Sequence, residues 1–176
     1  LHAMNVKHGL LRGRLRPKIL LAETYEEASK IIELYRYNLL GIISDVRFPK
    51  GGRINKAAGF ELAKQVKEMI NDLPFLLQSE DEENEKIALE RKINFLSKTS
   101  PSLLHNLRSY ILDSYGFGPF VFKYPDGRVI AEANDITALE KIVRDLPDES
   151  LQYHAANNDF SRWFRARAEF EVAEKL

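Results

Sequence analysis

Short apolar runs alternate with stretches of helical periodicity between residues 18 and 115, and this alternation limits the fold more than any other feature of the chain. Each run is too short for a helix and predicts a buried strand. Because strands joined through helices pair in parallel, the alternation predicts an α/β fold, a parallel sheet with helices on both faces. The predicted strands are 18–22, 39–43, 75–78 and 93–97.

Each predicted strand is followed by a pattern that is typical of a helix. Thr24 and Glu27 have the spacing of a capping box, and Ser79 and Glu82 repeat that spacing before an acidic stretch. Ser100, followed directly by a proline, predicts the start of a further helix. The expected helices lie at about 24–35, 60–70, 80–91 and 100–115.

Three polar residues stand at the ends of three successive predicted strands: Asp45, Ser79 and Lys98. Right-handed crossovers place the carboxyl ends of parallel strands at one edge, where open α/β sheets hold their chemistry. A carboxylate can attack phosphorus, and a lysine and a hydroxyl can stabilise charge on phosphoryl oxygens. Taken singly, the three have ordinary alternatives as a turn residue, a helix N-cap and a solvated lysine. Together they predict a phosphoryl site.

Charge and composition exclude several other functions. Lys plus Arg and Asp plus Glu both number 26, and a net charge of zero argues against a large nucleic-acid footprint. Cysteine is absent, which excludes a disulfide framework, a thiolate nucleophile and a cysteine zinc site. No apolar stretch approaches the length of a membrane span, and no signal peptide is visible. We therefore expect a cytoplasmic protein that binds neither membranes nor nucleic acid.

Asp45 followed by Pro49 and Gly59, with Ser79 and Lys98 at the next two strand ends, resembles the receiver domains of two-component response regulators. The resemblance implies a flavodoxin-like fold. It also implies that Asp45 accepts a phosphoryl group from a histidine kinase or a phosphotransfer protein. Ser79 and Lys98 would then contact the phosphoryl oxygens.

The same resemblance implies a Mg²⁺ ion, held by Asp45, the main-chain carbonyl of Arg47 and an acidic pair at the end of the first strand. Glu23 ends the first visible run, but only one helix fits between it and Asp45. In a receiver, a helix, a strand and another helix separate the acidic pair from the phosphoacceptor. The spacing therefore favours 18–22 as the second receiver strand. The first strand and its acids would lie upstream of Leu1, and Glu23 would be no metal ligand.

A second departure from the receiver pattern is the connection between Pro49 and Gly59, which is longer than the short turn expected there. Residues 50–58 are polar and rich in glycine, so we expect them to form a loop. Such a loop could contact a partner or be a tolerated surface insertion, and we favour the insertion.

Residues 116–176 differ in character and predict a small α+β appendage. A turn centred on Gly127 predicts a β-hairpin. Asn134 or Asp135 can cap the helix that follows the hairpin. The expected elements are strands at 120–123 and 129–131, a helix that ends before Pro147, and a helix from about Phe160 to the C-terminus.

The stretch from Tyr153 to Phe170 resembles a segment of large bacterial proteins in which a receiver-like region precedes a domain similar to phosphoenolpyruvate synthase and pyruvate phosphate dikinase. The resemblance extends to residues 16–22 and 40–49. It implies that this chain is the regulatory N-terminal part of such a phosphotransferase, whose catalytic machinery lies beyond Leu176. No phosphate-binding loop of the P-loop type occurs, so we do not expect the chain alone to be an enzyme.

These patterns divide the chain into three parts. We expect the end of an upstream helix or a linker at 1–17, a receiver-like domain at 18–115, and a linking or docking region at 116–176. The basic residues of the first part leave a basic arm as an alternative.

Two further features have ordinary explanations. His154 has no second ligand at metal-binding spacing, so we expect a structural histidine. The cluster Arg162–Arg167 mixes aromatic and basic residues, as nucleic-acid surfaces do. Its helical spacing instead favours a core or a docking face, and we favour docking to a neighbouring domain.

The favoured function is a signalling module that is phosphorylated on Asp45 in a phosphorelay and regulates an attached phosphoenolpyruvate synthase-like domain. One alternative is a dimerisation or scaffold module that does not depend on phosphorylation. Another is an integral part of the synthase-like enzyme. The expected partners are a histidine kinase or phosphotransfer protein, a downstream catalytic domain and, as a candidate, a second copy of the chain.

Overall fold

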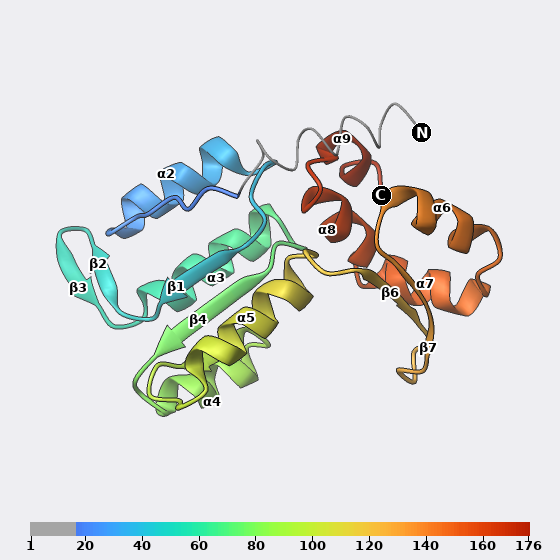
Figure 1. The fold of residues 1–176 in the computed structure, drawn as a ribbon. Coiled ribbons are helices and arrows are strands. Elements are labelled where there is room, and N and C mark those ends of the chain that lie inside the picture. The colour runs from blue at the N-terminus through green and yellow to red at the C-terminus, as the bar shows by residue number, and fades with distance from the viewer. Residues whose placement is uncertain (1–16) are drawn as a thin grey trace. The chain divides into compact units, whose positions relative to one another are not determined.

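The computed structural model describes residues 17–176 and places them in two compact units. One unit is Ile19–Tyr110, and the other is built chiefly from Ile111–Leu176 (Figure 1). The helix or linker expected at 1–17 falls almost wholly outside the described residues.

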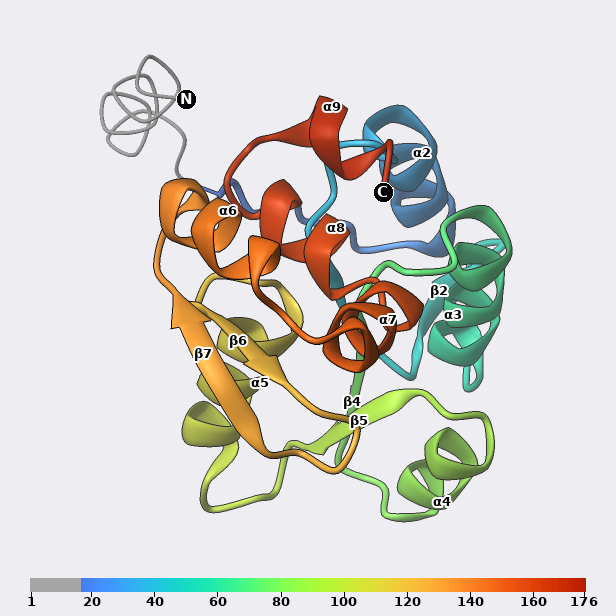
Figure 2. The same ribbon diagram turned by 90° about the vertical axis from the view of Figure 1, so that its right-hand side faces the viewer.

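The first unit holds a three-stranded parallel sheet, which confirms the mixed α/β expectation. Its strands are β1 (Ile42–Asp45), β4 (Phe75–Ser79) and β5 (Asn94–Ser97), in the order β1-β4-β5. Helices cover both faces of this sheet, as Figures 1 and 2 show from two directions. One face carries α2 (Tyr25–Tyr35), α3 (Ala58–Met69) and α4 (Glu83–Glu90), and the other carries α5 (Leu103–Ser114).

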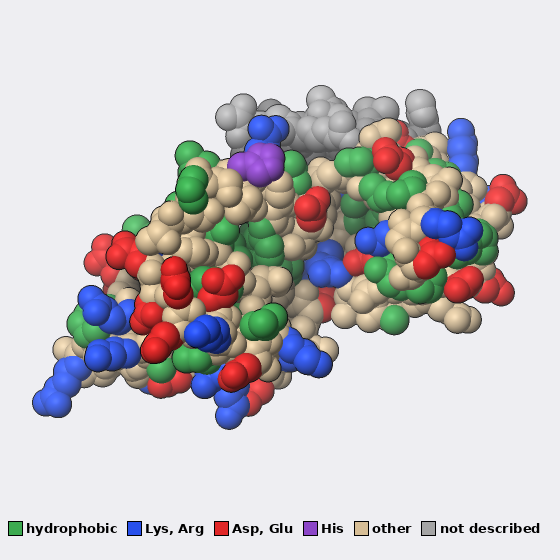
Figure 3. All heavy atoms as spheres, turned by 90° about the horizontal axis from the view of Figure 1, so that it is seen from below, with side chains coloured by type: hydrophobic (Ala, Val, Ile, Leu, Met, Phe, Trp, Pro, Cys, Tyr) green, Lys and Arg blue, Asp and Glu red, His purple; other side chains and the backbone are tan. Residues whose placement is uncertain are grey.

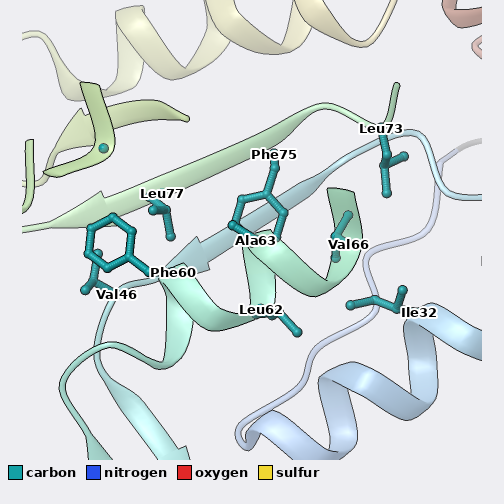
Figure 4. Close-up of a cluster of buried hydrophobic side chains, with 10 residues drawn as sticks. Ile32, Val46, Phe60, Leu62, Ala63, Val66, Leu73, Phe75 and Leu77 are labelled. Atoms are coloured by element: carbon teal, nitrogen blue, oxygen red, sulfur yellow. The ribbon is translucent and has the colours of Figure 1, made fainter. Parts of the chain in front are cut away.

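The core of the first unit lies between α3 and the sheet (Figure 4). Phe60 and Val66 of α3 are 3% and 1% exposed, and they pack with Leu77 of β4, which is fully buried. Leu62 points toward α2, where Ile32 completes the cluster. Each such side chain contributes about 1.5–3 kcal/mol when it is removed from water, so α3 fixes the sheet that carries Asp45.

Local capping explains where two helices of this unit begin. Thr24 Oγ1 accepts a hydrogen bond from the Glu27 N–H at 3.2 Å, which confirms the predicted cap of α2. The second predicted box does not form. Ser79 Oγ accepts from the Asp81 N–H at 3.1 Å, and Asp81 Oδ1 accepts from the Glu83 N–H at 2.9 Å. The residues before Glu83 form these two turns, so α4 begins at Glu83 and not at residue 80 as predicted.

Residues 18–22 do not form the predicted strand. Ile19 and Leu21 are 94% and 80% exposed, so their side chains enter no core. A strand requires a neighbour to pair its backbone groups, and no strand among residues 17–176 pairs with this segment. An apolar run therefore predicted a strand for which the described part of the chain offers no pairing partner.

The connection predicted as a loop at 50–58 is instead mostly a β-hairpin. Strands β2 (Phe48–Lys50) and β3 (Arg53–Asn55) pair in antiparallel fashion. Gly51 and Gly52 form the turn with φ of +60° and +74°. Positive φ at both central residues belongs to the two-residue turn whose twist matches the strands, and glycine allows it without strain.

The second unit contains the predicted hairpin and short helices. Asp135 caps α6 (Ile136–Arg144), because its Oδ1 accepts from the Ala138 N–H at 2.8 Å. The long C-terminal helix predicted from Phe160 is wrong, because Ala168 has a φ of +60° and interrupts it. The elements are β6 (Phe120–Lys123), β7 (Val129–Ala133), α6 (Ile136–Arg144), α7 (Asp148–Ala156), α8 (Asp159–Arg165) and α9 (Phe170–Ala173).

Aromatic side chains form the core of the second unit, and this corrects the docking role expected for the Arg162–Arg167 cluster. Trp163 is 2% exposed and packs edge-on to Phe120 with centroids 5.9 Å apart. The Arg167 guanidinium stacks on the Trp163 ring at 3.4 Å and donates to the carbonyl of Gly118. These groups are held inside their own unit and form no outward docking face.

His154 is 2% exposed, and both of its ring nitrogens have partners, as expected of a structural histidine. Nε2 accepts from the Lys123 N–H at 3.0 Å, so the proton lies on Nδ1 and is donated to Asp159 at 2.7 Å. Ser150 donates to the Lys123 carbonyl at 2.9 Å. The helix α7 therefore satisfies both backbone groups at the end of β6.

None of the helices within residues 17–176 combines the length with the apolar character needed to cross a membrane.

Candidate functional site

The three residues predicted to form a site lie at one edge of the parallel sheet. Asp45 is the last residue of β1, Ser79 is the last residue of β4, and Lys98 directly follows β5. The register pairs Asp45 with Gln78 and Ser79 with Ser97, so the strands end almost level. This placement agrees with the prediction from the strand ends.

Asp45 and Lys98 form an ion pair, with 2.6 Å between Asp45 Oδ1 and Lys98 Nζ. The two side chains are 50% and 32% exposed, so a reactant could reach the carboxylate from solvent. The Lys98 N–H donates to the Ser79 carbonyl at 2.9 Å, which fixes the lysine backbone to the end of β4. The geometry therefore supplies a solvent-accessible carboxylate with a fixed cation beside it.

The Ser79 hydroxyl is held by the loop that leads into α4. Its oxygen accepts from the Asp81 N–H at 3.1 Å and from Asn84 Nδ2 at 2.9 Å. Both bonds use the oxygen as the acceptor, so the hydroxyl proton is left to donate. A serine oriented in this way can donate a hydrogen bond to an anion at the sheet edge.

The backbone behind Asp45 touches the start of α3. The Gly59 N–H donates to the Val46 carbonyl at 2.9 Å. A Cβ atom at Gly59 would lie 2.2 Å from the Asp45 carbonyl oxygen, far closer than any real contact. Glycine is therefore required at this position for the helix to approach the strand that carries the carboxylate.

A Mg²⁺ ion at this site would find few protein ligands among the described residues. Asp45 supplies one carboxylate, and the Arg47 main-chain carbonyl could supply a second oxygen. No group of three His, Cys, Asp or Glu side chains able to hold a metal occurs within residues 17–176. Mg²⁺ commonly binds through one or two carboxylates and keeps several waters, so the two oxygens fit a largely hydrated ion.

The hairpin β2–β3 was not predicted from the sequence, which indicated a loop here. It begins three residues after Asp45 and is fixed to both neighbouring helices. The Gly51 N–H donates to Glu26 of α2 at 2.9 Å. Lys50 pairs with Glu61 of α3, and its ammonium lies 4.0 Å from the Tyr25 ring centroid. The Gly-Gly pair between two short runs was the signal that could have revealed this hairpin.

These contacts shift the pKa values of three groups that hold the hairpin against the two helices. The Gly51 N–H lowers the pKa of the Glu26 carboxyl. The Lys50 ammonium lowers the pKa of Glu61, and Glu61 in turn raises the pKa of Lys50. Both carboxylates and the ammonium are thus charged at neutral pH and committed to holding the hairpin in place.

Comparison with protein-family models, with curated proteins and with solved structures finds no match for this chain. The site must therefore be interpreted from its own geometry.

Proposed function

We propose that the unit Ile19–Tyr110 is a receiver-like regulatory module with a flavodoxin-like sheet, and that Asp45 accepts a phosphoryl group. The observation that carries the proposal is the Asp45–Lys98 ion pair at the carboxyl edge of a parallel sheet, with the Ser79 hydroxyl at the neighbouring strand end. A nucleophile, a cation and a donor are the groups that phosphoryl transfer requires.

In the proposed step, a carboxylate oxygen of Asp45 attacks the phosphorus of a phosphodonor. A new bond joins that oxygen to phosphorus, and the bond between phosphorus and the donor's leaving group breaks. For an acyl phosphate, the leaving group departs with the bonding electrons as a carboxylate. Lys98 then exchanges its carboxylate partner for a phosphoryl oxygen, and Ser79 donates to a second one. Mg²⁺, when bound, would supply further charge neutralisation.

Phosphorylation at this edge would act on Lys98 and on the loop that joins Ser79 to α4. The new group brings about −1.5 to −2 charges at neutral pH. It would draw Lys98 and the Ser79 loop toward itself and so bias the start of α4. We propose that a histidine kinase or phosphotransfer protein supplies the phosphoryl group, and that an attached phosphoenolpyruvate synthase-like domain responds to it.

The experiment is to incubate the protein with acetyl phosphate and Mg²⁺ and to measure phosphoryl incorporation by intact mass. We expect labelling that hydroxylamine removes and that Asp45→Asn abolishes. Asp113→Asn is the control, because Asp113 is an exposed carboxylate of α5 and ends no strand. Equal labelling of the Asp45→Asn protein and the native protein would refute the proposal.

A second candidate function is a scaffold that pairs two copies without phosphorylation. Leu89 of α4 and Leu104 of α5 are each 79% exposed, so each could enter a contact with a second copy. This function predicts a dimer by sedimentation that Leu89→Ser and Leu104→Ser together disrupt, whether or not Asp45 is labelled.

A further inference from the structure

The hairpin β2–β3 is built as a rigid projection beside the candidate phosphoryl site. Its two-residue turn, Gly51 and Gly52, has positive φ at both positions, and an added Cβ at either would meet no atom within 4 Å. The turn is thus set by its own backbone geometry and is open to solvent. On its inner side, Phe48 stacks on Tyr25 with ring centroids 6.5 Å apart. A projection that is anchored to two helices along one face and open to solvent on the other is suited to contact a partner.

The strand register separates the anchored face of the hairpin from the free face. Phe48 pairs with Asn55, and both face the helices, where Asn55 Nδ2 donates to Glu61 at 3.2 Å. Pro49 pairs with Ile54, and alternation turns this pair to the opposite face. Ile54 is accordingly 62% exposed. An exposed isoleucine in a well-anchored hairpin supplies an apolar contact that the unit itself does not use.

Two cations flank this apolar pair. Arg47 directly precedes β2 and Lys56 directly follows β3, and both are exposed. Neither forms an ion pair with any residue from 17 to 176. Arg53 pairs with Lys50, so alternation places it on the anchored face instead. Figure 3 shows basic side chains gathered at the end of the first unit that carries the hairpin.

The acids near the hairpin do not neutralise these cations. Glu26 is held by the Gly51 N–H, and Glu61 is held by Lys50 and Asn55, all on the anchored face. The free face therefore keeps two positive charges, those of Arg47 and Lys56, within a chain whose net charge is zero. A concentration of uncompensated charge next to an apolar contact is complementary to an acidic protein surface.

We propose that the hairpin face formed by Pro49 and Ile54, with Arg47 and Lys56 at its base, docks an acidic surface of a partner protein. Arg47 and Lys56 leave the base of the hairpin, two residues from Asp45 and two residues before the start of α3 respectively. A partner bound there would lie over the end of β1. That the partner is the phosphodonor rests on the proposed function, whereas the docking itself does not.

The chemistry of this face favours a protein over a nucleic acid. Two cations could neutralise only a few phosphates, whereas specific nucleic-acid binding commonly uses about 6–10 phosphate contacts. The apolar centre offers Ile54 and Pro49 and no aromatic ring on which a base could stack. A carboxylate-bearing protein surface with one apolar side chain matches the face in both respects.

The test uses the full chain and fluorescein-labelled poly-L-glutamate of about 20 residues, a length that can span one protein-sized contact. Binding is measured by anisotropy at low ionic strength and again at about 0.15 M, where the Debye length is about 8 Å. We expect Ile54→Ser with Lys56→Glu to weaken binding about tenfold or more, a change of about 1.4 kcal/mol. Lys86→Glu with Leu89→Ser, which makes the same two kinds of change at exposed positions of α4, should change it less than about twofold.

Two results would overturn the docking proposal. One is an equal effect of the hairpin pair and the α4 pair, because the binding would then not depend on the hairpin face. The other is tighter binding of duplex DNA or of anionic lipid vesicles than of poly-L-glutamate, because the face would then serve a different class of partner.

Acetyl phosphate separates this proposal from the proposed function. The hairpin variants should be labelled at Asp45 as well as the native protein, because a small donor needs no docking surface. If acetyl phosphate fails to label the native protein while poly-L-glutamate still binds through the hairpin, the phosphoacceptor role fails and the docking surface stands. If acetyl phosphate labels the native protein and the hairpin variants bind the peptide normally, the docking surface fails and the phosphoacceptor role stands.

Discussion

Lys98 Nζ lies 2.6 Å from Asp45 Oδ1, and this contact joins two strand ends that 53 residues of sequence separate (98 minus 45). Both side chains remain partly exposed, so water screens the pair. An ion pair of this kind contributes about 0–1 kcal/mol to stability. Its position at the sheet edge therefore matters more for chemistry than for folding.

Replacement of Lys98 should separate the contribution of this ion pair to stability from its contribution to phosphoryl transfer. We expect Lys98→Gln to change the free energy of unfolding by less than about 1 kcal/mol, because the pair is screened. The same change should slow phosphoryl incorporation from acetyl phosphate by about 10²-fold or more, because a fixed charge that stabilises the transition state is lost. Urea unfolding and the time course of labelling measure the two effects. Lys86→Gln is the control, and equal labelling rates in the two variants would contradict the prediction.

Gly59→Ala should disturb the strand that carries Asp45. The new methyl group would lie 2.2 Å from the Asp45 carbonyl oxygen and 2.9 Å from both Leu77 Cδ2 and Val46 Cα. Alanine normally favours a helix over glycine by about 1 kcal/mol, but overpacking costs about 1–3 kcal/mol and here involves the backbone. We expect net destabilisation in urea unfolding and weaker labelling at Asp45.

A matched glycine shows whether the close approach is the cause. At Gly118 an added Cβ meets only the Leu112 carbonyl oxygen, at 3.9 Å. Gly118→Ala should therefore change stability by less than about 0.5 kcal/mol. If Gly59→Ala is as well tolerated as Gly118→Ala, the packing of α3 against β1 is looser than described.

His154→Ala should destabilise the second unit. The change leaves the partly buried Lys123 N–H without its acceptor and removes one of the two partners of Asp159, which keeps Arg162. Loss of a buried donor's partner together with a core ring costs about 2–4 kcal/mol. The chain has a single tryptophan, Trp163, which lies in the same core, so its fluorescence follows the unfolding of this unit.

His105→Ala is the control for the histidine prediction, because His105 is exposed on α5. We expect its tryptophan transition to match that of the native protein. An unshifted transition in His154→Ala would mean that the two hydrogen bonds of the imidazole do not hold α7 against β6.

The hairpin anchor should weaken in acid. The pKa values of Glu26 and Glu61 are lowered in the folded protein, so both groups bind protons more readily once the hairpin detaches. Their contribution is present above the ordinary carboxyl pKa and is lost as the pH falls through the lowered values. Amide-exchange protection of the hairpin, corrected for intrinsic rates, should therefore drop in that range before the β1–β4 ladder loses protection.

Glu61→Gln tests the origin of this pH dependence. The variant loses the ion pair with Lys50, so its hairpin should be less protected at neutral pH and less sensitive to acid. Glu85→Gln removes an exposed carboxyl on α4 and should leave both properties unchanged. An acid response of the hairpin that Glu61→Gln does not reduce would assign the effect to other groups.

Local patterns predicted most of the elements around the site. The apolar run before Asp45 and the spacing of Thr24 and Glu27 depend on neighbours in sequence, and the structure contains the strand and the cap they indicate. The strand itself is displaced, from 39–43 to Ile42–Asp45, because strand ends depend on pairing with β4. The meeting of Asp45 and Lys98 followed from the parallel topology, since level strand ends share one edge.

Other features depended on contacts that no local pattern contains. The run 18–22 is apolar enough for a strand, yet a strand exists only where a neighbour pairs with it. The cluster around Trp163 reads equally well as a surface or a core, and packing against Phe120 decided for the core. The sequence by itself determined the order of the three strands of the parallel sheet and the residues at their ends. Tertiary structure decided which backbone groups found partners and which cations stayed free, because those depend on residues far apart in the chain.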